Sequence, residues 1–205
     1  MAGTLHLIPV FLGEDASLDG LPPESLKAVA CLDRFIVENA KTARNMLKRM
    51  GHPGPLRDLH IDVLATPPDP LQIRQLLAPL LAGESAGLMS EAGCPGVADP
   101  GALVVRLAHA SGIPVRPHVG PSSLLLALMA SGLDGQRFTF HGYLPIKEPE
   151  RSRCIKELET QSATMNQTQL FIEAPYRNDA MLAALLAACR PETRICVATD
   201  LTTDR

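Results

Sequence analysis

Residues 90–101 read SEAGCPGVADPG and directly follow the apolar run SAGLM, which ends at Met89. This short stretch holds three glycines, two prolines and two acids. Glycine adopts backbone angles that other residues avoid, and proline donates no hydrogen bond to a helix or a sheet. The stretch is therefore an irregular loop that follows a buried strand, and it is either a simple turn or a loop that binds a ligand.

Strand-like and helix-like segments alternate on both sides of this loop. Strands are expected at residues 4–10, 34–38, 59–64, 86–89 and 113–117. Helices are expected at residues 23–32, 40–50 and 69–81, and a further helix carries the apolar residues Leu103, Val104, Leu107 and Ala108. This alternation predicts an α/β fold in which helices cover a largely parallel sheet.

The pattern changes after His118, where we predict the boundary between two α/β domains, residues 1–118 and 119–205. In the second domain a buried helix ends at Gly132, and strands are expected at 137–144, 169–174 and 193–199. Two further helices are expected, a charged one before residue 169 and an apolar one at 178–189. The chain stops soon after the last strand, so either it is a shortened form or this domain lacks its final strands.

The composition is that of a globular protein, with 46% apolar and 20% charged residues and a formal net charge of −3 over 205 residues. A protein that binds nucleic acid on its own is usually basic. This net charge therefore favours an enzyme with a local basic patch over a dedicated nucleic-acid-binding protein. The N-terminus lacks the pattern of a signal peptide, and the longest apolar run, 124–130, is too short to span a membrane. We therefore expect a cytoplasmic protein without a membrane segment.

Common catalytic motifs are absent from the sequence. No glycine-rich dinucleotide fingerprint follows the first strand, and no P-loop, zinc-protease or nucleophile-elbow motif is present. The five cysteines show neither C-x-x-C spacing nor a nearby histidine pair, which argues against a zinc site and a disulfide framework. We expect no metal, and we interpret the cysteines mainly as small buried apolar residues.

Irregular stretches follow several of the predicted strands. They read PVFLGED, ENAK, SEAGCPGVADPG, VGPSS and EAPYR in chain order. Each of them alone is more typical of a turn than of a site. Parallel sheets bind ligands at the carboxyl ends of their strands, so five such stretches at one sheet edge indicate a binding site.

Four of the sequence motifs resemble those of a known family in their order along the chain. SEAGCPGVADPG is similar to SDAGTPGISDPG, HVGPSS to a motif with PGPSA, and IEAPYR to one with YESPHR. Between them, LLALMASGLDGQRFTFHGYLP follows the pattern ALSASGLPTDRFLFEGFLP. From Leu5 to about Asp200 the chain resembles the tetrapyrrole methylase family, the class III S-adenosylmethionine-dependent methyltransferases. Within it, the chain is most similar to the branch that methylates a cytidine ribose 2′-hydroxyl of 16S ribosomal RNA.

This resemblance implies two α/β domains with S-adenosylmethionine in the cleft between them, and a homodimer. Glycine-rich loops suit such a donor, because backbone N–H and C=O groups can approach its adenine, ribose, charged tail and sulfonium closely. By position, the resemblance implies donor contacts from nine residues: Pro9, Leu12, Gly93, Cys94, Val97, Ser122, Ser123, Glu173 and Ala174. Ser122 is also placed to cap the following helix. For Cys94 we expect the backbone, rather than the thiol, to matter.

A ribose hydroxyl is a poor nucleophile while it is protonated, so a positioned base assists the reaction. Glu38 is the candidate base, and a surface or helix-capping role is the alternative for it. Glu91, beside the donor loop, is a weaker candidate. The chain reads ENAK and LGED where the ribosomal RNA branch usually has EDTR and IGNL.

Three functions stay open at this point. The first is methyl transfer to small-subunit ribosomal RNA or a related ribose hydroxyl, with the ribosomal subunit as partner. The second is C-methylation of a tetrapyrrole, such as a uroporphyrinogen. The third is non-catalytic binding of S-adenosylmethionine by a sensor or scaffold.

Overall fold

The computed structural model describes residues 1–203, and the chain forms two compact units. Unit 1 comprises Met1–Ser123 and the segment that begins at Asp200, and unit 2 comprises Leu124–Thr199. The boundary predicted at His118 thus falls inside unit 1. The last two residues of the predicted second domain lie outside the described residues.

Unit 1 is built on a five-stranded parallel sheet with the strand order β3-β2-β4-β1-β5. The strands are β1 (Leu5–Ile8), β2 (Arg34–Val37), β3 (His60–Val63), β4 (Ala86–Met89) and β5 (Val115–Pro117). The helices are η1 (Leu18–Gly20), α1 (Pro23–Ala30), α2 (Ala40–Arg49), α3 (Pro70–Leu81) and α4 (Gly101–Ala110). The α/β fold and the parallel sheet predicted from the alternation are confirmed.

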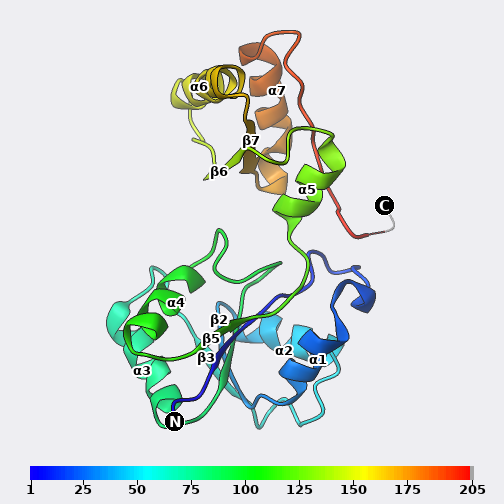
Figure 1. Cartoon of the computed structure of the whole chain (residues 1–205). Coiled ribbons are helices and arrows are strands. Elements are labelled where there is room, and N and C mark those ends of the chain that lie inside the picture. Colours follow the sequence, from blue (N-terminus) through cyan, green and yellow to red (C-terminus); the bar gives the residue numbers. More distant parts are fainter. Residues whose placement is uncertain (204–205) are drawn as a thin grey trace. The chain divides into compact units, whose positions relative to one another are not determined.

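Two apolar cores bury the two faces of this sheet. Helices α1 and α2 pack on one face through Val29 and Leu47, and α3 and α4 pack on the other through Leu77 and Val104 (Figure 1). In the sheet, β4 lies between β1 and β2. The chain passes from β1 to α1 and from β2 to α2, both on the first face, but from β4 to α4 on the second face. The chain therefore diverges at the carboxyl end of β4, the position where open α/β sheets bind ligands.

Local sequence explains where several elements begin and pack. The side chain of Asn39 accepts hydrogen bonds from the backbone N–H groups of Lys41 and Thr42 and so caps α2. Gly87 in β4 faces Phe35 in β2, and a Cβ at this glycine would lie 2.8 Å from the ring. The central strand can therefore contact this aromatic ring only because residue 87 has no side chain.

Unit 2 combines a two-stranded parallel sheet with three α-helices and one short 3-10 helix. Its elements are β6 (Phe138–Tyr143), α6 (Glu150–Met165), β7 (Thr168–Ile172), η2 (Pro175–Arg177) and α7 (Asn178–Ala188), preceded by α5 (Ser123–Ser131). The core of this unit contains Leu144, Ile155, Leu158, Met181 and Leu185.

The prediction of a strand at residues 193–199 is wrong, because the structure has no regular element there. The alternating apolar residues Ile195 and Val197, which suggested a strand, are exposed. Strand preference depends on packing against a neighbouring strand, and none of the described strands pairs with this segment.

The interpretation of the cysteines as buried residues is also wrong. Cys31 and Cys196 are exposed, and the other three are partly exposed. In residues 1–203 no helix is both long and apolar enough to cross a membrane, and no cluster of three side chains suited to a metal ion occurs.

Candidate functional site

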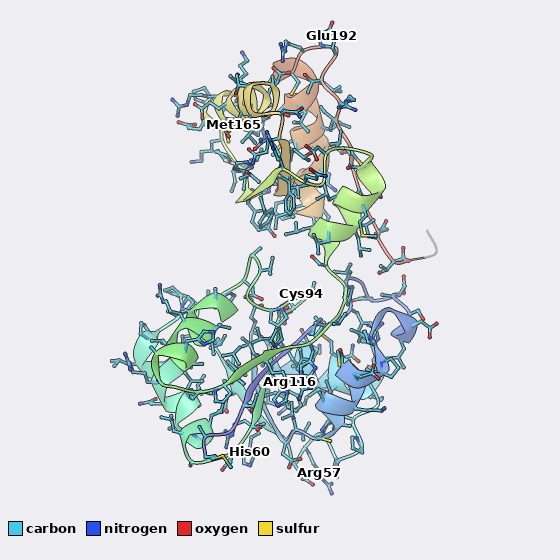
Figure 2. The ribbon with its side chains drawn as sticks, viewed as in Figure 1. Arg57, His60, Cys94, Arg116, Met165 and Glu192 are labelled. Atoms are coloured by element: carbon cyan, nitrogen blue, oxygen red, sulfur yellow. The ribbon has the colours of Figure 1, made fainter. Side chains whose placement is uncertain are left out.

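Loops after β1, β2, β4 and β5 meet the same edge of the unit 1 sheet, because these strands are parallel. Cys94 in the β4 loop lies at this carboxyl edge, whereas His60 and Arg57 lie at the opposite edge (Figure 2). The fifth predicted stretch, EAPYR, follows β7 in unit 2. Four stretches, rather than five, therefore share the edge of this sheet.

The loops after β1 and β4 are joined through their backbones. Val10 and Gly93 form an antiparallel bridge, in which the N–H of Val10 donates to the carbonyl of Gly93 over 2.9 Å. Gly93 has a φ of +68°, and a Cβ there would lie 3.2 Å from the side chain of Leu12. The bridge brings three of the predicted donor residues together, namely Pro9, Leu12 and Gly93.

The loop after β5 packs against both of these loops. Gly120 touches Pro9 so closely that an added Cβ would overlap the proline ring. The thiol of Cys94 donates to the carbonyl of Pro121 over 3.3 Å. Burial raises the pKa of the Cys94 thiol, which keeps its proton available for this bond. The Cys94 thiol thus links two loops, whereas the expectation that its backbone contacts the donor stays a prediction.

Asp99, which was not among the predicted site residues, fixes the conformation of the β4 loop. Its carboxylate accepts hydrogen bonds from the N–H groups of Gly96, over 2.8 Å, and Gly101, over 2.7 Å. Ala98 between them has a φ of +60°, which is unusual for a residue with a side chain. An Asp followed by Pro-Gly is a typical turn pattern, so the sequence did contain a signal for this role.

Glu38 lies at the end of β2, beside β4, and is half-buried. Its carboxylate accepts a hydrogen bond from the backbone N–H of Glu91 over 3.3 Å. Burial and, next, the charge of Asp99 raise the pKa of Glu38, against the lowering effect of the Glu91 N–H. Such a carboxylate binds a proton more tightly than a surface acid does. The capping role that was the alternative for Glu38 belongs instead to Asn39.

The other predicted donor residues of unit 1 lie on the same loops. Val97 is exposed on the β4 loop, and Ser122 and Ser123 lie between the β5 loop and α5. Ser122 is half-buried, whereas Ser123 is exposed and begins α5.

Glu173 and Ala174, the remaining predicted residues, form a separate cluster in unit 2. The Glu173 carboxylate accepts a hydrogen bond from the Ala174 N–H over 2.7 Å and forms an ion pair with the Arg177 guanidinium over 2.6 Å. The guanidinium also lies 5.7 Å from the ring centre of Tyr143. Arg177, which was not among the predicted site residues, thus fixes the orientation of Glu173. Its place four residues after Glu173, within EAPYR, was the available signal.

We expect Asp99→Ala to loosen the β4 loop. The substitution leaves the N–H groups of Gly96 and Gly101 without their acceptor, a loss of about 1–3 kcal/mol for a partly buried group. Hydrogen exchange at these two amides should accelerate, whereas Asp99→Asn, which keeps a side-chain oxygen, should protect them partly. Unchanged exchange in Asp99→Ala would show that the carboxylate does not hold the loop.

Comparison with known proteins first gives close relatives. The chain is 36% identical over 203 residues to the ribosomal RNA small subunit methyltransferase I of Xylella fastidiosa strain 9a5c, covering 98% of this chain and 69% of that protein. It is 30% identical over 200 residues to the enzyme of the same name from Pseudomonas aeruginosa, covering 98% of this chain and 67% of that protein. With the Temecula1 strain of Xylella fastidiosa, the identity is 36% over 85% of this chain and 60% of the relative. The chain thus spans 60–69% of the length of these relatives. No family model matches it.

Solved structures share the fold at lower sequence identity. A conserved hypothetical protein from Aeropyrum pernix K1 matches with a TM-score of 0.63 and 17% identity, over 92% of this chain and 65% of that one. A uroporphyrin III C-methyltransferase from Thermus thermophilus matches with a TM-score of 0.57 and 15% identity, over 92% and 78%. A diphthine synthase matches with a TM-score of 0.58 and 16% identity, over 84% and 66%. These structures support the fold assignment.

Proposed function

Because this chain belongs to the ribosomal RNA small subunit methyltransferase I family, we propose that it transfers a methyl group from S-adenosylmethionine to ribosomal RNA of the small subunit. The proposed acceptor is a ribose 2′-hydroxyl. A cytoplasmic location and a homodimer, both expected from the resemblance to the tetrapyrrole methylases, belong to the same proposal.

The observation that carries this proposal is the convergence of three loops at the carboxyl end of β4. The Val10–Gly93 bridge, the Cys94–Pro121 hydrogen bond and the contact of Gly120 with Pro9 hold these loops together. Their glycines have no side chain between the backbone and a ligand, which suits a ligand with an adenine edge, a ribose and a charged tail. The residues present therefore fit S-adenosylmethionine.

We assign the donor contacts of unit 1 to the residues on these loops and of unit 2 to the cluster around Glu173. The first group contains Pro9, Leu12, Gly93, Cys94, Val97, Ser122 and Ser123, and the second contains Glu173 and Ala174. Backbone carbonyls of the loops favour a positive charge such as a sulfonium. The carboxylate of Glu173, held by Arg177, is a suitable acceptor for an N–H or O–H group of the donor.

The donor supplies a methyl group that is already activated by its sulfonium. The task left to the chain is therefore to hold the hydroxyl and to take its proton. Glu38 is suited to this second task, because its raised pKa makes its carboxylate a better proton acceptor than an ordinary glutamate. Its hydrogen bond with the Glu91 N–H keeps the carboxylate oriented at the carboxyl edge of the sheet.

Transfer of labelled methyl from S-adenosylmethionine tests this proposal directly. We expect label in the RNA of 30S subunits, at a ribose 2′-oxygen, and none in uroporphyrinogen III. If only the tetrapyrrole is labelled, the methyl acceptor is a tetrapyrrole carbon and not ribosomal RNA. Donor binding without transfer to either acceptor would favour the non-catalytic alternative.

A further inference from the structure

A hollow of about 440 Å³ lies beside the β4 loop in unit 1. It is bounded by the segment between β3 and α3, by the end of the β4 loop and by the first turns of α4. Its lining residues are Pro68, Asp99, Pro100, Ala102, Leu103 and Arg106. None of them is among the residues assigned above to donor binding.

The chemistry of this hollow combines apolar walls with one available cation. Pro68, Pro100 and Leu103 supply apolar surface. The exposed guanidinium of Arg106 makes no ion pair or hydrogen bond within residues 1–203. The carboxylate of Asp99, in contrast, is already engaged by the N–H groups of Gly96 and Gly101. The hollow therefore offers an unpaired guanidinium, and the carboxylate in its lining has its charge partly offset by the two N–H groups that it binds.

This combination suits one residue of a nucleic-acid strand. An arginine guanidinium matches a phosphate because its planar donors bind two oxygens at once, and apolar walls accept the faces of a base and a sugar. The volume is within the range typical of small-ligand sites.

The position of the hollow connects it with the candidate base. Asp99 lines the hollow and also lies near enough to Glu38 for its charge to act on that carboxylate. A nucleotide in the hollow would therefore lie on the same sheet edge as both Glu38 and the donor loops.

We propose that this hollow is the subsite for one nucleotide of the acceptor RNA, in which Arg106 binds a backbone phosphate. This inference rests on the proposed function, because it places the acceptor of that reaction. It adds a specific contact, since Arg106 places a positive charge in the lining of the hollow, on the sheet edge that also carries the acids Glu38 and Glu91.

The test compares Arg106→Ala with Arg57→Ala. Both variants lose one exposed positive charge, but Arg57 lies at the opposite edge of the sheet (Figure 2). Co-sedimentation with 30S subunits in the presence of S-adenosylhomocysteine, over a series of salt concentrations, measures RNA binding without methyl transfer. Calorimetry with S-adenosylmethionine measures donor binding separately.

We expect Arg106→Ala to weaken binding of 30S subunits about tenfold, and to flatten the plot of log affinity against log salt by roughly 0.7, the contribution of one single-strand phosphate. Donor affinity should stay unchanged, and Arg57→Ala should behave as the unmodified chain. Arg106→Lys should retain the salt slope, because it retains the charge, with an intermediate affinity.

Two other results would overturn the inference. If Arg106→Ala binds 30S subunits as Arg57→Ala does, the hollow is not an RNA subsite, although the proposed function survives. If Arg106→Ala loses donor affinity, the hollow belongs to the donor site. A chain that binds the donor but no 30S subunits contradicts the RNA acceptor of the proposed function itself.

Discussion

Replacing Glu38 by Gln should lower kcat for methyl transfer to 30S subunits by about 10²–10⁴-fold, the usual contribution of a general base. Glutamine keeps the shape of the side chain and an oxygen that can accept the hydrogen bond from the Glu91 N–H. It cannot, however, take a proton from a hydroxyl. The affinity for S-adenosylmethionine should therefore stay within about twofold of the original value. This is well below the tenfold change in affinity that corresponds to about 1.4 kcal/mol of binding free energy.

The pH profile gives this prediction a second readout. Glu38 acts as a base only when ionised, so activity should fall as the pH drops through its pKa. Because burial and the charge of Asp99 raise this pKa, the acidic limb should lie above the range of an ordinary glutamate. In Asp99→Asn the charge is absent, and the limb should move to lower pH.

Glu91→Gln is the matched control, because it changes an exposed acid whose backbone N–H binds Glu38 and whose side-chain charge is the smallest of the effects that raise the pKa of Glu38. It should retain most of the activity. If Glu91→Gln is as inactive as Glu38→Gln, or if Glu38→Gln retains full kcat, Glu38 is not the base.

Gly120→Ala should abolish measurable donor binding at donor concentrations that saturate the unmodified chain. The added methyl group would overlap the Cβ of Pro9 and lie 2.8 Å from its Cγ. A proline ring cannot rotate away, so the loops after β1 and β5 must separate. Overpacking of this kind costs about 1–3 kcal/mol of stability, and the donor site loses its shape as well.

Gly20→Ala serves as the control, since an added Cβ there meets nothing within 4 Å. Calorimetry with S-adenosylmethionine, together with urea unfolding of both variants, separates the two effects. A folded Gly120→Ala that binds the donor normally would show that the contact between these loops is not required for the site.

Much of the fold could be predicted from local sequence. The alternation of strand and helix patterns predicted the parallel sheet of unit 1, because short apolar strands buried on both faces alternate there with helices that bury one face. The motifs SEAGCPGVADPG, HVGPSS and IEAPYR predicted the family, and the relatives confirm it. The strand predicted at residues 193–199 is absent. An alternating apolar pattern indicates which side chains a strand could bury, but it does not indicate whether a neighbouring strand is present to pair with it.

The candidate site was predictable only in part, because its contacts join residues far apart in the chain. The Cys94–Pro121 hydrogen bond spans 27 positions, and the Glu38–Glu91 hydrogen bond spans 53. The composition and the motif spacing of the sequence do not indicate which distant residues form these hydrogen bonds. The cap at Asn39, by contrast, joins neighbouring residues, and such a cap is readable from sequence.

The central claim is that the loops around the carboxyl end of β4 bind S-adenosylmethionine. Isothermal titration calorimetry of the full chain with S-adenosylmethionine tests it most directly. We expect saturable binding with one site per chain, which Gly120→Ala abolishes and Gly20→Ala preserves. Absence of any binding heat, with no change in the Tm of the chain on addition of the donor, would contradict it.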